Sequence, residues 1–324
     1  MVPSGLFYPS FIALLMTRLL QPRQQTPATS TTNEPPMRGS MPPGLQLLAS
    51  QSTPNGDKKK DNKPGIAGDF KYGKRQEGEL AVKGHGDSHR FAPNDVQQGQ
   101  LGNCYFMASL MAIAKSHPNW LQQNIDGPLD NGTFNVRLFS RNLFGGWEPK
   151  IYNVDPRFPM QKDDPYKFAY AQPGDLDGAY ETELWVMLYE KAFAQRQGSY
   201  NNTDGGFEED AMEAITGQEH TRYGFSGGVA EIGRWSEAEI RSGVQKHLNA
   251  GMPVTASTHM QVFIDGSSEA KFARENKIVG KHAYAVLSSS ATHVRVRNPW
   301  GGEKAEVVMT WRQFRNLFAD YTTR

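Results

Sequence analysis

The chain contains a single cysteine, Cys104, among its 324 residues, and this limits how its fold can be stabilised. One cysteine cannot form a disulfide within the chain or supply a zinc site built from several cysteines. The fold must therefore be stabilised by packing, and a chain of this length can bury a core of sufficient size. At roughly 150 residues for a typical domain, the length predicts about two domains.

The first 65 residues differ in composition from the rest of the chain. Residues 21–65 are rich in Pro, Gln, Ser, Thr, Asn and Lys and contain no aromatic residue. Such a segment cannot bury enough apolar surface to offset its loss of entropy on ordering. Residues 1–65 are therefore predicted to form a disordered leader or linker.

An apolar run, GLFYPSFIALLM, lies close to the first residue. It is twelve residues long, which is too short to cross a bilayer as a helix. A secretory signal would have a basic residue before this run and a clean cleavage site after it, and the sequence shows neither. We therefore expect no clear membrane association and favour an intracellular location, while secretion stays open.

Charge excludes one class of partner. The chain has 35 basic and 34 acidic residues, which gives a net charge of +1. Because a nucleic-acid-binding surface is usually strongly basic, we do not expect nucleic acid as a partner.

Hydrophobic spacing divides the remaining residues into two lobes. Residues 66–225 are predicted to be mainly helical, and residues 226–324 to be mainly β-sheet. The predicted elements are helices at 104–116, 180–197, 236–250 and 310–318, and strands at 133–139, 147–154, 253–258, 282–289 and 292–298. These patterns are typical of an α+β protein with a helical lobe and an antiparallel β lobe.

Cys104 lies where a polar, glycine-containing turn meets the first predicted helix. Asn103 is a residue type that caps helices, and the positive end of the helix dipole favours a thiolate. The thiolate is the nucleophilic form of cysteine, so this position favours a catalytic residue. The alternative interpretation is a small buried core residue, which is a frequent environment of cysteine.

A catalytic thiolate needs a histidine base and a group that orients it. His282 begins one predicted strand and Asn298 ends the next, so antiparallel pairing would bring them side by side. The Asn298 amide oxygen could then accept from one ring nitrogen and leave the other facing the thiol, with Trp300 covering this bond. Without a function, His282 is a strand residue and Asn-Pro-Trp-Gly an ordinary turn.

Gln98 precedes Cys104 by six residues, across the turn GQLGN. Glycines allow this turn to fold tightly. The Gln98 side chain and the Cys104 backbone amide could then face one developing oxyanion. The alternative is an ordinary polar loop.

Four segments together resemble the protease core of the calpains, which are cysteine proteases related to papain. These segments are QGQLGNCYFMASL, ELWVMLYEKAFAQRQGSY, KHAYAVL and RVRNPWGG. They occur in the family order of Gln, Cys, His and Asn, and the resemblance extends over about residues 90–318. It implies a two-lobed papain-like fold with the active site in the cleft between the lobes.

The resemblance also implies a role for each matched residue. Cys104 would be the nucleophile, His282 the acid and base, Asn298 the orienting residue and Gln98 the oxyanion donor. Gly205 and Gly206, in TDGGF, match the stretch that pairs with the substrate backbone, and Trp300 belongs to the same substrate-binding region.

The sequence departs from the family pattern in three places. Lys281 stands where the family usually has glycine before its histidine. The segment after NPWGG lacks the family's second tryptophan and its acidic loop. We also expect a protease core without a calmodulin-like calcium module or a C2-like domain.

Calpain cores hold a calcium ion in each lobe, so the resemblance implies candidate metal ligands. Asp95 lies nine residues before Cys104, where the family places a ligand, and Glu190 resembles an acidic partner on the second helix. Asp95 could instead cap a turn, and Glu190 could be a solvated helix charge. We predict at most one calcium, in the helical lobe, while the chemistry itself needs no cofactor.

The sequence therefore predicts a calpain-like cysteine endopeptidase that hydrolyses proteins through a thioester acyl-enzyme. A transglutaminase-like acyl transferase is one alternative, although such enzymes use Asp where this chain has Asn298. A non-catalytic binding module that retains the core is the other alternative.

Overall fold

The computed structural model describes residues 63–66, 70–84, 86–174, 182–225, 235–260, 267–302 and 304–324. By its contacts the chain divides after Asp61, and all described residues belong to the second unit, Asn62–Arg324. The predictions for the leader up to residue 62, including its apolar run, lie outside the described residues. Among the described residues, no helix combines the length and the apolar character needed to cross a membrane.

The last residues of the predicted leader are attached to the core. Gly65 pairs with Ser199, and its carbonyl oxygen accepts from the Tyr200 amide at 2.9 Å. The Tyr72 hydroxyl donates to the Pro64 carbonyl oxygen at 2.7 Å. The boundary predicted at residue 65 is therefore too late, because these backbone groups find partners in the core.

The first lobe combines buried helices with short sheets. Its helices are α2 (Cys104–Ser116), α3 (Pro118–Gln123), α4 (Trp185–Gln197) and α5 (Glu208–Thr216), with 3-10 turns η2 (Pro93–Asp95) and η3 (Asn201–Thr203). Its strands are β1 (Phe70–Arg75), β2 (Gly78–Glu79), β3 (Ile125–Asp126), β4 (Phe134–Arg141), β5 (Trp147–Val154), β6 (Arg157–Gln161) and β7 (Thr182–Glu183). They form one three-stranded sheet, in the order β3-β4-β5, and the pairs β1-β6 and β2-β7.

The helix α2 begins and ends where the sequence predicts. It starts at Cys104, stops before His117 and Pro118, and has a buried apolar run from Tyr105 to Ala114. Asn103 occupies the N-cap position, but its side chain makes no capping hydrogen bond. Its Nδ2 atom donates instead to Glu190 Oε1 on α4, at 2.8 Å. The predicted cap is therefore wrong, because a buried carboxylate is the stronger acceptor for this amide.

The helix α4 starts later than predicted, at Trp185 instead of residue 180. Thr182 and Glu183 form the strand β7, which pairs with β2, so this short pairing replaces the first helical turn. The helix ends at Gly198, whose positive φ of 91° is a conformation that glycine adopts without strain.

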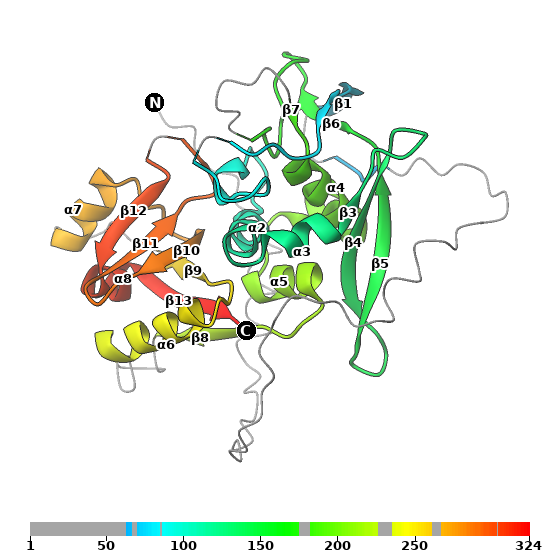
Figure 1. Ribbon diagram of the computed structural model, residues 1–324. Coiled ribbons are helices and arrows are strands. Elements are labelled where there is room, and N and C mark those ends of the chain that lie inside the picture. Colours follow the sequence, from blue (N-terminus) through cyan, green and yellow to red (C-terminus); the bar gives the residue numbers. More distant parts are fainter. Residues whose placement is uncertain are drawn as a thin grey trace. The chain divides into compact units, whose positions relative to one another are not determined.

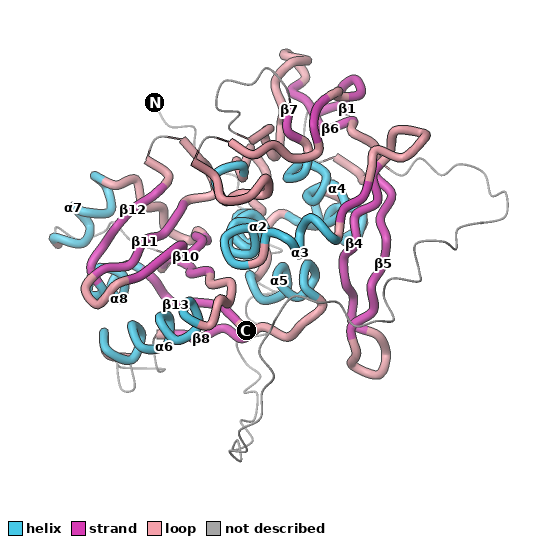
Figure 2. The backbone as a smooth tube through the Cα atoms, in the orientation of Figure 1, coloured by secondary structure: helices cyan, strands magenta, loops and turns pink. Residues whose placement is uncertain are grey.

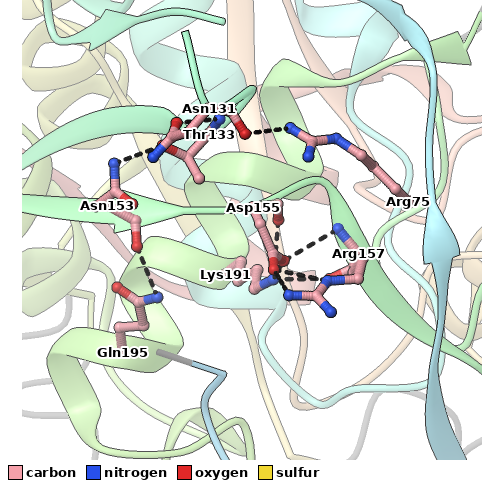
Figure 3. A network of polar contacts seen from close by, with 8 residues as sticks. All are labelled: Arg75, Asn131, Thr133, Asn153, Asp155, Arg157, Lys191 and Gln195. Atoms are coloured by element: carbon pink, nitrogen blue, oxygen red, sulfur yellow. Dashed lines mark hydrogen bonds and ion pairs between the residues drawn. The ribbon is translucent and has the colours of Figure 1, made fainter. Parts of the chain in front are cut away.

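A buried lysine on α4 fixes the turn between β5 and β6. Lys191 Nζ donates to the carbonyl oxygens of Asp155 and Arg157, at 2.8 and 2.7 Å, and also contacts the Asp155 carboxylate. Figure 3 shows these contacts together with the Arg157–Asp155 ion pair. Burial lowers the pKa of Lys191 to about 8, and the Asp155 carboxylate opposes this shift. Lys191 is thus a structural residue with three acceptors, as a buried ammonium group requires.

The second lobe is built on a six-stranded sheet in the order β12-β11-β10-β9-β13-β8. Its strands are β8 (Thr221–Gly224), β9 (Thr255–Thr258), β10 (Ala283–Ser289), β11 (His293–Arg297), β12 (Glu306–Thr310) and β13 (Phe318–Thr323). Its helices are α6 (Glu237–Asn249), α7 (Ser268–Glu275) and α8 (Trp311–Leu317). Capping boxes at Ser236 and Thr310 confirm both predicted helix starts.

The two lobes meet along β10. Alternate side chains of a strand point to opposite faces, and here each face enters a different core. Ala283 and Ala285 pack with α2 in the core of the first lobe, whereas Tyr284 and Val286 pack in the core under α6 and α8. Figure 2 shows α2, α3 and α5 between the strands of the second sheet and the strands β3, β4 and β5.

The second sheet also includes residues that the sequence assigned to the first lobe. The strand β8 pairs with β13, so the division predicted at residue 225 falls after a strand of the second sheet. Figure 1 shows β8 beside the C-terminal strand. In other respects the described chain has the predicted α+β architecture, with a helical lobe and an antiparallel β lobe.

Candidate active site

The Cys104 thiol lies at the first residue of α2 and beside the start of β10. The backbone amide of Ala283, the residue after His282, lies close enough to this thiol to lower its pKa. Burial raises the pKa of Cys104 to about 11, and the Glu208 carboxylate adds to this shift. The helix terminus was expected to favour a thiolate, but burial has the larger effect in this structure. The thiol is therefore neutral near pH 7 and needs a base.

His282, just before β10, and Asn298, just after β11, form a hydrogen-bonded pair where these two strands of the second sheet begin and end. His282 Nε2 lies 2.8 Å from Asn298 Oδ1, and the Trp300 backbone amide donates to the same oxygen at 2.9 Å. An oxygen that accepts from a backbone N–H is identified as the carbonyl oxygen of the Asn298 amide. Nε2 must then carry the ring proton, which leaves Nδ1 as the basic nitrogen.

The surroundings of His282 favour the neutral ring. Burial lowers its pKa to about 4, although the hydrogen bond that the ring donates to Asn298 opposes this change. Among the described residues, no hydrogen bond joins Cys104 to His282. The structure thus holds a neutral thiol and a neutral imidazole on neighbouring segments, and catalysis requires the two side chains to approach each other.

Two aromatic rings enclose the His282 ring. The Trp300 ring lies 4.8 Å away at 52°, and the Tyr284 ring lies 5.1 Å away at 90°. The Tyr284 hydroxyl accepts from the Val279 amide at 2.8 Å, and Thr258 Oγ1 accepts from the His282 amide at 3.0 Å. The sequence analysis missed Tyr284, although strand alternation places it on the same face as His282.

Gln98 lies in the loop before α2 and is bonded to neighbouring backbone. Its Nε2 donates to the Leu101 carbonyl oxygen at 2.6 Å, and its backbone amide donates to the Pro299 carbonyl oxygen at 2.7 Å. The side-chain oxygen of Gln98 is buried without a hydrogen-bond partner. The Gln98 backbone therefore joins its loop to the loop that follows Asn298, while the Gln98 side chain bonds within its own loop.

Gly205 and Gly206 contact the segment that precedes Cys104. The Gly205 amide donates to the Gly102 carbonyl oxygen at 2.8 Å, and Gly102 donates to Asp204 Oδ1 at 3.1 Å. A Cβ atom on Gly206 would lie 2.4 Å from the Tyr105 ring. Only glycine fits this approach, so the structure places this predicted substrate-binding segment directly against the α2 start.

The two predicted calcium ligands have different environments. Glu190 is buried, accepts from Asn103 Nδ2 at 2.8 Å and accepts from the Ala171 amide at 3.1 Å. Its oxygens are thus engaged in holding α2 and the segment before residue 174 together. Asp95 Oδ2 accepts from the Ala92 amide and from the Trp185 indole. The structure pairs Glu190 with Asn103 and Ala171 instead of with Asp95, so the pairing predicted from the sequence is wrong.

The carboxylate that faces Asp95 belongs to Glu183. A Cβ atom on Gly174 would lie 2.0 Å from Glu183 Oε2 and 3.1 Å from Asp95 Cβ. Burial, with a contribution from the neighbouring carboxylate Asp95, raises the pKa of Glu183 to about 8. Burial likewise raises the pKa of Asp95 to about 7.

The chemistry of this carboxylate pair suits a hard cation. Calcium prefers carboxylate and carbonyl oxygens, and two buried acids of like charge are stabilised in their ionised form by a cation. Among the described residues, no group of three or more His, Cys, Asp or Glu side chains is arranged for a metal. Asp95 and Glu183 would therefore bind calcium with further ligands from backbone oxygens. The sequence prediction chose an acid within α4, Glu190, whereas the acid that faces Asp95 lies just before this helix.

The fold and this site define a papain-like arrangement of a cysteine, a histidine and an asparagine across two lobes. Comparison with known proteins identifies the family within this class of papain-like folds. The family described as calpain family cysteine protease matches residues 79–316, which is more than half of the chain. The chain belongs to the calpain family.

Curated calpains resemble this chain at moderate identity. It is 30% identical to calpain clp-4 of Caenorhabditis elegans over 225 residues, which cover 65% of this chain and 28% of that protein. It is 30% identical over 222 residues to a calpain-type cysteine protease of Arabidopsis thaliana, covering 65% of this chain and 9% of that protein. It is 27% identical to calpain-5 of Mus musculus over 231 residues, which cover 64% of this chain and 34% of that protein. The chain thus spans about a third or less of these relatives.

Proposed function

We propose that this chain is a cysteine endopeptidase whose nucleophile is Cys104. The observation that carries this proposal is the tautomer of His282, in which Nε2 is bonded to Asn298 and Nδ1 stays basic. The Cys104 thiol lies against the amide of the next residue, Ala283. A cysteine and a correctly oriented imidazole on neighbouring segments are the requirement for thiol-dependent acyl transfer.

In the proposed reaction, His282 Nδ1 takes the proton of the Cys104 thiol as the sulfur attacks the scissile carbonyl carbon. The carbonyl oxygen becomes an oxyanion, which the Cys104 amide and Gln98 Nε2 stabilise. His282 then gives its proton to the leaving amine, the C–N bond breaks, and a thioester remains on Cys104. Water attacks this thioester while His282 accepts a proton. The acid leaves, and the thiol regains its proton.

Both reacting groups are neutral in the described arrangement, so moving a proton between them is unfavourable there. A shorter distance between the sulfur and Nδ1 would stabilise the ion pair, since each charge favours the other. We therefore propose that the active state brings the Cys104 sulfur and His282 Nδ1 closer together.

The test compares hydrolysis of casein and of a fluorogenic peptide by the wild type and by Cys104→Ala and His282→Ala. Each substitution should lower kcat/KM by at least about 10⁴-fold, because the nucleophile or its base is lost. His293→Ala, at the exposed start of β11, is the matched control and should retain wild-type activity. A Cys104→Ala protein that cleaves at the wild-type rate would refute the proposal.

We further propose that Asp95 and Glu183 bind one calcium ion in the first lobe. Their raised pKa values, about 7 and about 8, support this site because both acids lack a nearby cationic side chain strong enough to offset burial. Calcium supplies positive charge that keeps both groups ionised. Around it, Trp185 and the amides of Ala92 and Val82 hold the carboxylates in place.

This proposal predicts a pH dependence with a definite sign. The folded chain holds these protons more tightly than the unfolded chain, so without calcium its stability falls as pH rises from about 4 to about 8. Calcium competes with the protons, and its affinity should therefore rise over the upper part of this range.

Calorimetric titration of calcium at pH 8 and at pH 5.5 checks this expectation. We expect one ion at pH 8, much weaker binding at pH 5.5, and loss of binding in Asp95→Asn and Glu183→Gln. Asp126→Asn, an exposed acid on β3, is the control. Equal calcium affinity at the two pH values, or in the Glu183→Gln protein, would contradict the site.

A further inference from the structure

A cavity lies next to the His282–Asn298 pair, and its lining comes from α7 and the residues after it and from the loop that joins β11 to β12. Figure 1 shows where α7, β11 and β12 lie in the second lobe. Its volume is about 690 Å³, which is in the range of sites that bind small ligands or several side chains. Asn298 and Trp300 line one side of it. The cavity is therefore adjacent to the candidate active site and shares Asn298 and Trp300 with it.

The cavity has an apolar floor and basic groups around it. Ala273, Ile278 and Ala305 line it, and each is at most 2% exposed. Arg274 and Lys277, at the end of α7, and Lys304, before β12, also line it and are exposed.

These three cations have no ion pair or side-chain hydrogen bond among the described residues. The neighbouring described acids are engaged with other bases: Glu275 pairs with Lys271, and Glu306 pairs with Arg295 and Arg297. Glu303 lies outside the described residues. Three unpaired cations facing one cavity favour an anionic occupant, because opposite charges attract most strongly where water is partly excluded.

The proposed reaction places this cavity on one side of the scissile bond. The acyl part of the substrate stays attached to Cys104, on α2, whereas the leaving amine takes its proton from His282. The leaving segment must therefore pass His282, whose ring is 4.8 Å from that of Trp300. Trp300 lines the cavity and is half exposed, so it connects the site of proton transfer with the three cations.

We propose that this cavity binds acidic side chains of the substrate on the leaving-amine side of the scissile bond. The inference rests on the proposed peptidase function. Arg274, Lys277 and Lys304 provide the charge that recognises Asp or Glu, and the floor receives the methylene groups of these side chains. The chain then selects substrates with acidic residues directly after the cleaved bond.

The test uses a triple variant that removes the charges with little effect on the backbone. Arg274→Gln and Lys304→Gln keep long polar side chains. Lys277 has a positive φ of 53°, so Lys277→Asn is chosen because asparagine tolerates this conformation. Lys271→Gln, on the same helix but outside the cavity lining, is the matched control.

Two measurements are made with peptide pairs that carry either Asp and Glu or Asn and Gln in the first three positions after the scissile bond. Fluorescence anisotropy measures binding of labelled peptides to Cys104→Ala protein, with and without the three charge substitutions. The ratio of kcat/KM for the two peptides measures selection by protein with Cys104 intact.

We expect the acidic peptide to bind about tenfold more tightly than its amide counterpart, as a few partly exposed ion pairs would give. The preference should disappear in the triple variant, persist in Lys271→Gln, and shrink at about 0.5 M salt. The kcat/KM ratio should change in parallel. Equal binding of the two peptides, or no detectable binding of either, would overturn the proposal.

The two measurements separate this proposal from the function on which it rests. Charge-dependent binding without any cleavage would support the cavity and refute the peptidase. Cleavage without preference for acidic peptides, together with equal binding, would refute the cavity and leave the peptidase intact.

Discussion

The His282 and Asn298 side chains that the second lobe brings to the candidate site are bonded to each other, whereas among the described residues no hydrogen bond joins the Cys104 or Gln98 side chain to either of them. His282, Asn298 and the Trp300 amide form one hydrogen-bonded unit that fixes the tautomer of the imidazole. Cys104 is a partly buried thiol with a raised pKa, and Gln98 Nε2 donates to the Leu101 carbonyl oxygen. The imidazole is therefore held in one orientation by its own lobe, and under the proposed function the half of the site that carries Cys104 rearranges.

Under the proposed function, a metal in the first lobe would act on the half of the site that carries Cys104 and Gln98. Asp95 lies in the short segment before Gln98, and its partner Glu183 directly precedes α4. A cation at this pair would act on the loop that carries Gln98 and leads to Cys104. By contrast, the acid Glu190 already accepts two hydrogen bonds and needs no metal to hold its position.

The largest effects that sharpen this comparison come from the two amide side chains. Asn298→Ala should lower kcat by about 10³-fold, because the preorganised tautomer of His282 is lost.

Gln98→Ala should lower kcat by about a hundredfold, because one oxyanion donor is lost. Steady-state kinetics with a fluorogenic peptide distinguishes the two. A Gln98→Ala protein that loses affinity but keeps its turnover rate would contradict the oxyanion role.

A smaller effect concerns the residue before His282. Lys281 adopts a positive φ of 53°, a conformation that costs a non-glycine residue about 1 kcal/mol. Lys281→Gly should therefore raise the free energy of unfolding by up to about 1 kcal/mol, measured by urea denaturation. The structure thus gives a physical reason for the glycine that the family usually has there. A clear loss of stability would mean that the lysine side chain contributes more than its backbone costs.

Much of the fold could be predicted because local patterns and tertiary packing agree. The period of α2, the capping boxes at Ser236 and Thr310 and the alternation along β10 are all local signals. Antiparallel pairing of β10 with β11 brings Asn298 close to His282. The calpain resemblance supplied the roles of these residues, which stay predictions until they are measured.

The misses share one cause, which is that burial depends on distant parts of the chain. Asn103 was predicted to cap α2, but its side chain donates instead to Glu190, which is 87 residues away in the sequence. Glu183 was overlooked because nothing in the sequence shows that β7 brings it to Asp95. The dipole of α2 predicted a thiolate, yet burial of Cys104 raises the pKa of the thiol.

The central claim is that Cys104 and His282 act together as nucleophile and base. Because Cys104 is the only cysteine, a peptide-like alkylating reagent can modify only one thiol, and mass spectrometry of the intact protein follows its rate. At pH 7 the wild type and His293→Ala should react at equal rates, and His282→Ala at least about a hundredfold more slowly, since no base remains to take the thiol proton. Equal rates for the wild type and His282→Ala would contradict the claim.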